Sequence, residues 1–269
     1  MQMSDICVQN DKIATYQSSG VGRDIFFIHG NSADSFVFKN QLEGDFGAQH
    51  HVYSLDLPGC GLSNKAKDLD STYSLQGLAD VVTTVIDHLQ LKHPIVVGHS
   101  LGGHLLLRIC QKVKGLSGCV IFGAPPVPNL EAMAEGFLPS PAVELMMKGE
   151  VNNTELNLWV SELTENPETR KVIAEKIKST DPNFRTCFGN SLMTSTLDDE
   201  MGLLNQIDIP IAIFHGEFDK LVNLDYLEKI KHPNLWKHKI HVIKNSGHFP
   251  QFDQPEVFNQ LLTEFIEFY

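Results

Sequence analysis

Short apolar runs alternate with longer amphipathic stretches along most of this chain. Runs such as 24–28, 51–57 and 95–97 are rich in β-branched or aromatic residues, which is typical of buried strands. The stretches between them repeat with the period of a helix, and the clearest one is capped by Ser74 and extends to Leu89. Strands that alternate with helices predict βαβ units and a parallel sheet.

The chain opens with a different pattern, a short antiparallel hairpin formed by 6–9 and 13–17. Further strands are predicted at 24–28, 51–57, 95–97, 118–122, 210–214 and 239–244, and helices at 35–43, 75–89, 101–110, 225–231 and 255–268. We therefore expect an α/β fold with a mostly parallel eight-stranded sheet and helices on both faces.

The alternation stops between 127 and 205, where the pattern is helical throughout. Helices are predicted at 131–137, 142–148, 154–163 and 168–178, separated by prolines. We interpret 127–205 as an inserted helical cap, with 1–126 and 206–269 forming the two parts of the core. Its large apolar side chains should pack mostly with one another, and a minority should line a cleft below: Met133, Phe137, Met146, Met147, Trp159, Phe184 and Met193.

Composition narrows the classes of function. The formal net charge of −12 argues against nucleic acid or an anionic membrane surface as a partner. The five cysteines are scattered and form no C-x-x-C pair, which fits a reduced protein. The first ten residues show neither the basic nor the apolar region of a signal peptide, so we expect a cytoplasmic protein. We expect a monomer or homodimer that acts on a small molecule.

One stretch carries a specific chemical signal. Gly98-His99-Ser100-Leu101-Gly102 fits G-x-S-x-G and lies between a predicted strand and a predicted helix. Such a turn strains the serine backbone and leaves no room for side chains two residues to either side. It would raise the Ser100 hydroxyl above the sheet edge and aim the Leu101 N–H at a developing anion.

Other strand ends supply the partners that a serine nucleophile needs. In an open parallel sheet, reactive groups gather beyond the carboxyl ends of the strands. His248 follows the last strand and is the predicted base, and Asp219 follows the preceding strand and would orient the imidazole. Glu217 is the rival acid on the same turn, whereas Asp208 precedes the strand and lies at the wrong end. Asn31, in the turn after 24–28, would supply a second oxyanion donor through its N–H.

Each of these residues also has a structural interpretation. The glycine-rich junction around Ser100 could serve only packing, His248 could stabilise a turn, and Asn31 could cap one. His99 and His104 flank the nucleophile turn and are expected to be structural, although His99 could touch the cleft. No metal and no cofactor are expected, because the chain has no H-E-x-x-H pattern, no histidine–carboxylate cluster at ligand spacing, and no G-x-G-x-x-G after a strand.

With these motifs in hand, the chain resembles the α/β-hydrolase superfamily along nearly its full length. Within it, the chain is similar to the capped bacterial hydrolases that open N-acyl-homoserine lactones. The stretch Asp56 to Ser63 supports the superfamily together with the motifs above. The stretches shared with this branch are His29-Gly30-Asn31-Ser32, Gln41-Leu42-Glu43-Gly44, Ser100-Leu101-Gly102-Gly103-His104, Pro125-Pro126-Val127, Gly136-Phe137, Asn234-Leu235-Trp236 and Lys239 to His248. The resemblance implies a metal-free serine lactonase or esterase that holds acyl chains under its cap.

Three positions depart from that branch. Its acid is a glutamate where this chain has Asp219, and a cap tyrosine that contacts substrate there aligns with Trp159. Tryptophan has no hydroxyl, so the contact would become an indole N–H donor or stacking. His99 also differs from the residue expected in the branch. We expect the substrate to contact Trp159, His99, Phe137 and Met133.

These observations predict a serine hydrolase that cleaves a carboxylic ester or lactone through an acyl-enzyme, with N-acyl-homoserine lactones as the first substrate class. A general carboxylesterase for small acyl esters is the nearest alternative, and a carbon–carbon hydrolase or a lyase could use the same groups. Dehalogenase and epoxide-hydrolase chemistry need an aspartate where this chain has Ser100. A non-catalytic ligand receptor on the same scaffold remains an alternative of another class.

Overall fold

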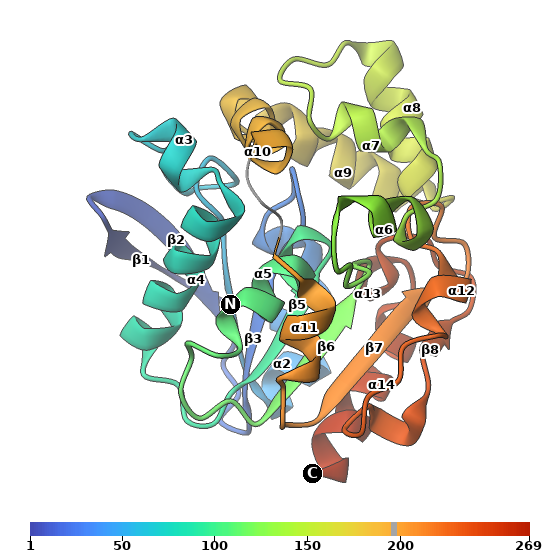
Figure 1. Cartoon of the computed structure of the whole chain (residues 1–269). Coiled ribbons are helices and arrows are strands. Elements are labelled where there is room, and N and C mark those ends of the chain that lie inside the picture. The colour runs from blue at the N-terminus through green and yellow to red at the C-terminus, as the bar shows by residue number, and fades with distance from the viewer. Residues whose placement is uncertain (195–197) are drawn as a thin grey trace.

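The fold, taken from a computed structural model that describes residues 1–194 and 198–269, is built on one eight-stranded sheet (Figure 1). The strand order is β1-β2-β4-β3-β5-β6-β7-β8. The strands are β1 (Gln2–Val8), β2 (Asp11–Gln17), β3 (Asp24–Ile28), β4 (His51–Leu55), β5 (Ile95–His99), β6 (Gly118–Phe122), β7 (Ile211–Gly216) and β8 (His241–Ile243). The neighbouring pairs from β4 to β8 are parallel, whereas β1–β2 and β2–β4 are antiparallel. The predicted mostly parallel α/β sheet is confirmed.

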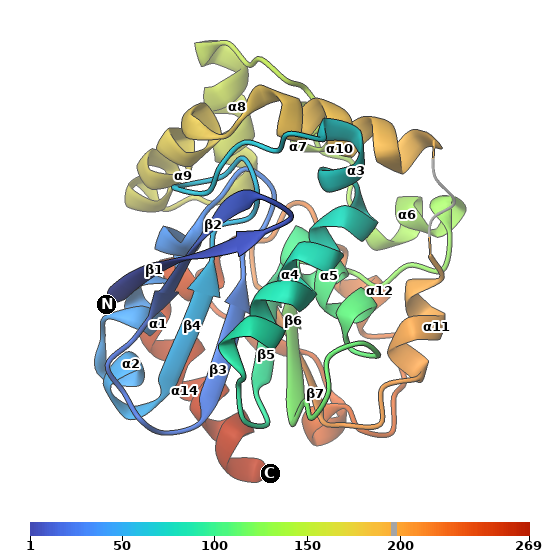
Figure 2. The same cartoon turned by 90° about the vertical axis from the view of Figure 1, so that its left-hand side faces the viewer.

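Helices cover both faces of this sheet (Figure 2). The amphipathic helix α4 (Leu75–Leu89) packs on α5 (Leu101–Ile109), with Ser74 capping its first turn through the Gly77 N–H. The opposite face carries α1 (Lys39–Leu42), α2 (Asp45–Gln49) and α14 (Pro255–Phe268). The central strands, buried between two helix layers, have almost continuously apolar sequences, as parallel strands do.

A group of helices between β6 and β7 lies beyond the carboxyl ends of the strands (Figures 1 and 2). They are α6 (Leu130–Gly136), α7 (Pro141–Leu145), α8 (Asn153–Leu163), α9 (Pro167–Ser179) and α10 (Pro182–Thr194). This is where the inserted cap is expected. α11 (Glu200–Asn205) falls inside the predicted range 127–205, but it packs on α5, where Glu200 accepts hydrogen bonds from Arg108 (2.7 Å) and His104 (2.9 Å).

The remaining elements are short. They are a 3-10 turn at Ser35–Phe38, α3 (Leu69–Thr72), α12 (Leu224–Leu227), a second 3-10 turn at Trp236–His238, and α13 (Pro250–Asp253). The helix predicted at 225–231 ends at Leu227, and the strand predicted at 239–244 covers only His241–Ile243. None of the helices in the described part of the chain is both long and apolar enough to cross a membrane.

Candidate active site

Ser100 stands at the corner between β5 and α5 with a strained backbone. Its φ is 51° and its ψ is −120°, in the left-handed half of conformational space that non-glycine residues rarely occupy. A Cβ on Gly98 would collide with the Gly102 carbonyl, and one on Gly102 with the Ile28 carbonyl. The steric reason predicted for the two glycines is therefore present. The Ser100 N–H donates to the Phe122 carbonyl of β6 (2.8 Å), which fixes the turn to the neighbouring strand.

His248 and Asp219 form a buried pair at the same edge of the sheet. His248 Nδ1 lies 2.8 Å from Asp219 Oδ2, and the two residues are 3% and 7% exposed. The other carboxylate oxygen accepts the Leu221 N–H (2.8 Å) and the Val222 N–H (3.2 Å). Burial by itself would raise the pKa of Asp219, but the charge and hydrogen bond of His248 hold it below its ordinary value. The carboxylate is thus kept ionised against the imidazole.

Glu217, the rival acid, faces elsewhere. Its carboxylate accepts from Lys244 Nζ (2.7 Å) and from the Asn245 N–H (3.0 Å), on the outer side of the turn. The Lys244 hydrogen bond lowers the pKa of this side chain. Two residues of the same turn therefore have separate partners, and the structure gives the imidazole to Asp219.

The imidazole of His248 lies next to the nucleophile turn. A Cβ placed on Gly123, the residue after Phe122, would come within 2.8 Å of His248 Cε1. The ring of His99, the residue before Ser100, is centred 5.0 Å from the His248 ring. Among the described residues, the Ser100 hydroxyl makes no hydrogen bond to His248. Catalytic contacts of this kind are often long in unliganded enzymes and tighten when substrate binds.

The turn after β3 lies in close contact with Ser100. A Cβ on Gly30 would come within 2.9 Å of Ser100 Cβ, so only glycine allows this approach. Buried His29 fixes the turn: its Nε2 accepts the Leu57 N–H (2.9 Å), so its Nδ1 carries the proton and donates to the Gly30 carbonyl (2.8 Å). In the described part of the chain, neither the Asn31 N–H nor the Leu101 N–H has an acceptor. Both predicted oxyanion donors are therefore free.

The cap contacts this turn through polar side chains. Asn31 Nδ2 donates to the Met146 carbonyl (3.1 Å), and the Ser32 hydroxyl donates to Asn31 Oδ1 (2.7 Å). Arg185 of α10 donates to Ser32 Oγ (3.2 Å), to the Ile177 carbonyl (3.1 Å) and to the Gly149 carbonyl. Burial lowers the pKa of Arg185. Sequence reasoning missed this residue, because an arginine in a helical pattern gives no sign of where its long side chain reaches.

A second set of cap contacts holds the histidine loop. The His248 N–H donates to the Leu163 carbonyl at the end of α8 (2.7 Å). The carboxylate of Asp253 accepts from the Thr164 hydroxyl (2.8 Å), the Thr169 hydroxyl (2.6 Å) and the Gly247 N–H (2.9 Å). Burial raises the pKa of Asp253. Asp253 was also missed by sequence reasoning, since it comes after the last strand with no motif around it.

The four residues predicted to contact substrate differ in how deeply they are buried. Trp159 of α8 is 1% exposed, and the Arg185 guanidinium lies 6.0 Å from its ring centre. Its indole N–H has no hydrogen-bond partner among the described residues. Phe137 is half-buried and pairs with Val222 in an isolated β-bridge next to the Asp219 turn, and Met133 lies one turn earlier on α6. His99 is fully buried under other aromatic rings.

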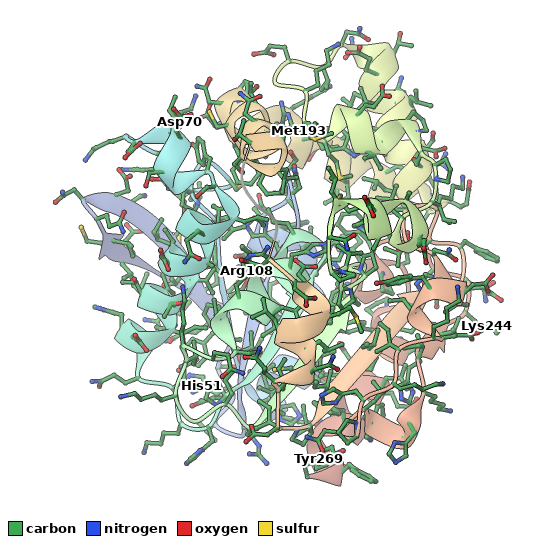
Figure 3. The ribbon with its side chains drawn as sticks, in the orientation of Figure 1. His51, Asp70, Arg108, Met193, Lys244 and Tyr269 are labelled. Atoms are coloured by element: carbon green, nitrogen blue, oxygen red, sulfur yellow. The ribbon has the colours of Figure 1, made fainter. Side chains whose placement is uncertain are left out.

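The prediction that most large apolar cap residues pack with one another holds only in part. Trp159 and Phe184 are buried, which agrees with a packed cap. Met193 near the end of α10 is 72% exposed, so it packs in no core (Figure 3).

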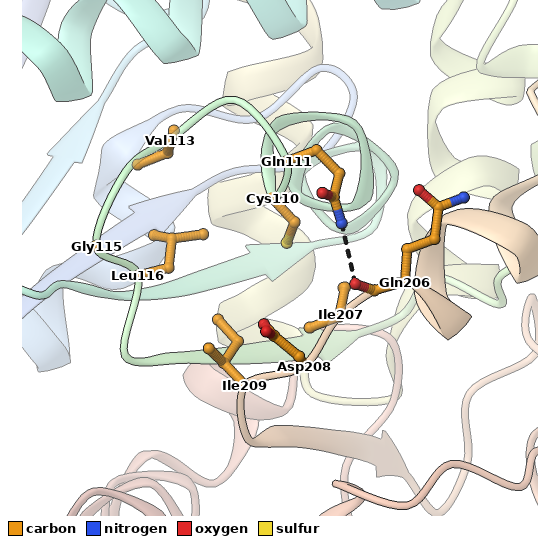
Figure 4. A pocket seen from close by; sticks show the side chains of 9 residues that line it. All are labelled: Cys110, Gln111, Val113, Gly115, Leu116, Gln206, Ile207, Asp208 and Ile209. Atoms are coloured by element: carbon orange, nitrogen blue, oxygen red, sulfur yellow. Dashed lines mark hydrogen bonds between the residues drawn. The ribbon is translucent and has the colours of Figure 1, made fainter.

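A surface hollow lies at the other end of the sheet. It is lined by residues after α5 and before β7, and Gln111 Nε2 donates to the Gln206 carbonyl across it (3.1 Å; Figure 4). These residues precede β6 and β7, so the hollow adjoins the amino ends of the strands and not the edge that carries Ser100. Within residues 1–194 and 198–269, no three His, Cys, Asp or Glu side chains are grouped so that they could hold a metal ion.

Comparison with known proteins identifies the family and the shared fold. Residues 25–261 match the model of the alpha/beta hydrolase family. The crystal structure of a serine-to-glycine variant of the N-acyl homoserine lactonase AidH, complexed with N-hexanoyl homoserine lactone, superimposes with a TM-score of 0.92. It is 30% identical and is matched over 99% of this chain and 97% of its own. A putative aryl esterase from Burkholderia cenocepacia, 20% identical with a TM-score of 0.82, shares the fold over 99% of this chain and 98% of its own.

Sequence relatives give the same assignment. The AB hydrolase superfamily protein YisY of Bacillus subtilis is 24% identical over 260 residues, which is 91% of this chain and 92% of that protein. The putative esterase/lipase 1 of Mycoplasma genitalium is 25% identical over 265 residues, 90% of this chain and 91% of that protein. The family match covers most of the chain, from the start of β3 into α14, and spans each element that carries the site. This chain belongs to the alpha/beta hydrolase family.

Proposed function

We propose that this protein is a serine hydrolase that cleaves a carboxylic ester or lactone through an acyl-enzyme on Ser100. The observation that carries the proposal is the buried Asp219–His248 pair, with its 2.8 Å hydrogen bond, at the sheet edge where Ser100 is held in a strained turn. A carboxylate that binds Nδ1 leaves Nε2 as the nitrogen that can take a proton from a nucleophile. Asp219 therefore prepares His248 to act as the general base beside Ser100.

In the first half of the reaction, Ser100 attacks the carbonyl carbon while His248 Nε2 takes the hydroxyl proton. Negative charge moves to the carbonyl oxygen, where the free N–H groups of Asn31 and Leu101 stabilise it. The Leu101 N–H lies at the amino end of α5, so the helix dipole adds to this effect. Asp219 stabilises the imidazolium that forms and keeps its orientation.

In the second half, His248 returns the proton to the leaving oxygen. In a simple ester this oxygen departs as an alcohol, whereas in a lactone it stays attached as the hydroxyl of the opened ring. Water then attacks the acyl-enzyme with His248 as base, and Ser100 is restored. Every step uses one proton shuttle and one oxyanion site, so removal of the serine removes the whole path.

N-acyl-homoserine lactones are the substrate class that we propose first. AidH, which is similar to this chain over nearly its full length, binds N-hexanoyl homoserine lactone in its crystal structure. The half-buried Phe137 and Met133 of the cap are apolar side chains that an acyl chain could contact. The indole N–H of Trp159, which has no partner in the part of the chain that the structure describes, could donate to an amide or ester oxygen.

A general carboxylesterase is the second candidate, and Trp159 is the observation that favours it. The indole is fully buried against Arg185, so it fills space with a bulkier ring than a tyrosine would. If this bulk narrows the space that the cap leaves for substrate, short esters would fit better than an N-acylated ring. The two candidates share the serine chemistry and differ only in what the cap admits.

The test is a substrate panel read by pH indicator, with homoserine lactones of several acyl lengths beside simple chromogenic esters. We expect Ser100→Ala to lower kcat by about 10⁴ to 10⁶ on any substrate that turns over. Ser71→Ala, an exposed serine on α3, is the matched control and should keep wild-type rates. Turnover of esters alone would select the second candidate. Near-normal hydrolysis by Ser100→Ala would refute the serine mechanism. If the wild type turns over no substrate, and a serine-directed phosphonate forms no adduct with Ser100, the result would favour a non-catalytic ligand receptor.

A further inference from the structure

His99 lies between the nucleophile and the base and has no part in the reaction steps above. It precedes Ser100 at the end of β5, and its Nε2 lies 2.9 Å from the backbone carbonyl of His248. A carbonyl oxygen only accepts, so Nε2 must carry the proton and donate. One side chain thus joins the serine turn directly to the backbone of the catalytic histidine.

The remaining contacts of His99 hold it in this one orientation. Its ring stacks on Phe122 with centres 4.8 Å apart and an angle of 24°. Phe249 meets it edge-on at 4.6 Å. The residue is 0% exposed, so the ring has no open space into which it could turn.

The protonation state of His99 follows from its burial. Nδ1 is buried, has no hydrogen-bond partner within residues 1–194 and 198–269, and faces Gly30, where an added Cβ would lie 3.1 Å away. A second proton on that nitrogen would leave a buried charge unpaired. Burial accordingly lowers the pKa of His99 well below its ordinary value. The neutral tautomer with hydrogen on Nε2 is the form that makes the bond to His248.

The backbone of His248 is therefore held at both of its polar groups. Its N–H donates to the Leu163 carbonyl of α8 (2.7 Å), and its carbonyl accepts from His99. The first contact ties the histidine to the cap and the second ties it to the serine. Of these two backbone contacts, the second links His248 to the strand that carries Ser100.

We propose that His99 is a positioning residue that sets the place of the His248 imidazole relative to Ser100 through the Nε2–H···O=C hydrogen bond. This rests on the proposed function, because it assigns a role in that same reaction. It replaces the expectation that His99 contacts substrate, since the ring is enclosed on all sides by protein. A misplaced base slows proton transfer and leaves substrate binding intact, so kcat should fall while KM stays unchanged.

Three variants separate the hydrogen bond from packing. His99→Phe keeps an aromatic ring between Phe122 and Phe249 but removes the donor. His99→Gln restores an N–H at the position of Nε2 without the ring. His241→Phe is the matched control: His241 is also buried, stacks on Trp236 at 24°, and has its Nε2 3.3 Å from the Trp236 carbonyl, away from the serine turn.

The experiment measures the rate at which a fluorophosphonate labels Ser100, by peptide mass spectrometry, together with kcat and KM on a chromogenic ester. We expect His99→Phe to label about 10- to 100-fold more slowly and to lose kcat by a similar factor at unchanged KM. His99→Gln should recover most of both rates, and His241→Phe should match the wild type. Near-UV circular dichroism checks folding, and His99→Met, which also lacks a donor, replaces His99→Phe if that variant does not fold.

The outcomes distinguish failure of the proposed function from failure of the positioning role of His99. Wild-type protein that is not labelled at Ser100 would overturn the proposed function itself. If the wild type labels, then His99→Phe at the wild-type rate would overturn the positioning role. Equal slowing in His99→Phe, His99→Gln and His241→Phe would also overturn it, because loss of packing alone would then explain the effect.

Discussion

Replacement of Asp219 by asparagine removes the negative charge of the proposed Ser100–His248–Asp219 triad with little change of shape. The carboxylate accepts three hydrogen bonds, from His248 Nδ1, the Leu221 N–H and the Val222 N–H. An asparagine has one oxygen and one NH₂ group at this place. Its oxygen can keep the two backbone donors, which leaves the NH₂ group facing Nδ1. His248 must then carry its proton on Nε2, where it cannot accept one from Ser100.

The size of the effect follows from the loss of the active tautomer and of the charge that stabilises the imidazolium. An Asp-to-Asn exchange in a Ser–His–Asp triad lowers kcat by about 10⁴. This corresponds to about 5 kcal/mol of lost transition-state stabilisation. The pair is buried, so water cannot replace the missing charge. We therefore expect a loss of kcat on the order of 10³ to 10⁴ for Asp219→Asn, with KM changed by less than about threefold.

The assay is steady-state hydrolysis of a chromogenic ester, with Glu217→Gln as the control. Glu217 lies two residues away and binds Lys244 and the Asn245 N–H, so its exchange should leave kcat within about twofold of the wild type. Comparable losses in both variants would show that the turn, and not the carboxylate of Asp219, matters. Activity retained in Asp219→Asn together with loss in Glu217→Gln would refute the assignment of the acid.

The same pair and the cap contacts lead to two further predictions. The folded-state pKa of Asp219 lies below its unfolded value of about 4, so its ionised form stabilises the fold above that pH and this contribution is lost as pH falls through the folded pKa. The difference in the free energy of unfolding between wild type and Asp219→Asn, measured in urea, should thus shrink from about pH 6 to about pH 3; a constant difference would contradict it. Arg185→Met leaves the buried Ser32 hydroxyl, the buried Ile177 carbonyl and the part-buried Lys148 carbonyl without this donor. We expect a loss of about 3 kcal/mol in unfolding free energy and a lower kcat/KM, with Arg23→Met as control. Unchanged stability and activity in Arg185→Met would contradict the link between cap and turn.

The elements that the sequence predicts well have strong local signals. Helix α14 begins and ends where Pro255 and the amphipathic pattern place it, and β3 and β6 coincide with their apolar runs. Helix α10 lies in the region that was predicted to be helical throughout, but no bounds were predicted for it, because Pro182–Thr194 has a weak apolar period and contains Gly189. The helix predicted at 225–231 stops at Leu227, since the chain there turns by local 3-10-type hydrogen bonds such as Lys229 N–H to the Tyr226 carbonyl.

In the candidate site, too, the residues with local sequence signals were predicted and those that act through long-range contacts were not. The order of Ser100, Asp219 and His248 along the chain, each after a strand, let the sequence place them at one edge. The choice between Asp219 and Glu217 needs the direction of two side chains on one turn, which residue types alone do not give. The contacts of Arg185 with Ser32 and of His99 with His248 join residues about 150 positions apart, and no local pattern encodes them.

The formation of a covalent acyl-enzyme on Ser100 is the most direct test of this account. A p-nitrophenyl ester is mixed with enzyme, the release of nitrophenol is followed in the first turnover, and the quenched protein is mapped by mass spectrometry. The account predicts a burst close to one nitrophenol per active site and an acyl group on the peptide that carries Ser100. Steady turnover with no burst, and with quenched protein that carries no acyl group at Ser100, would contradict it.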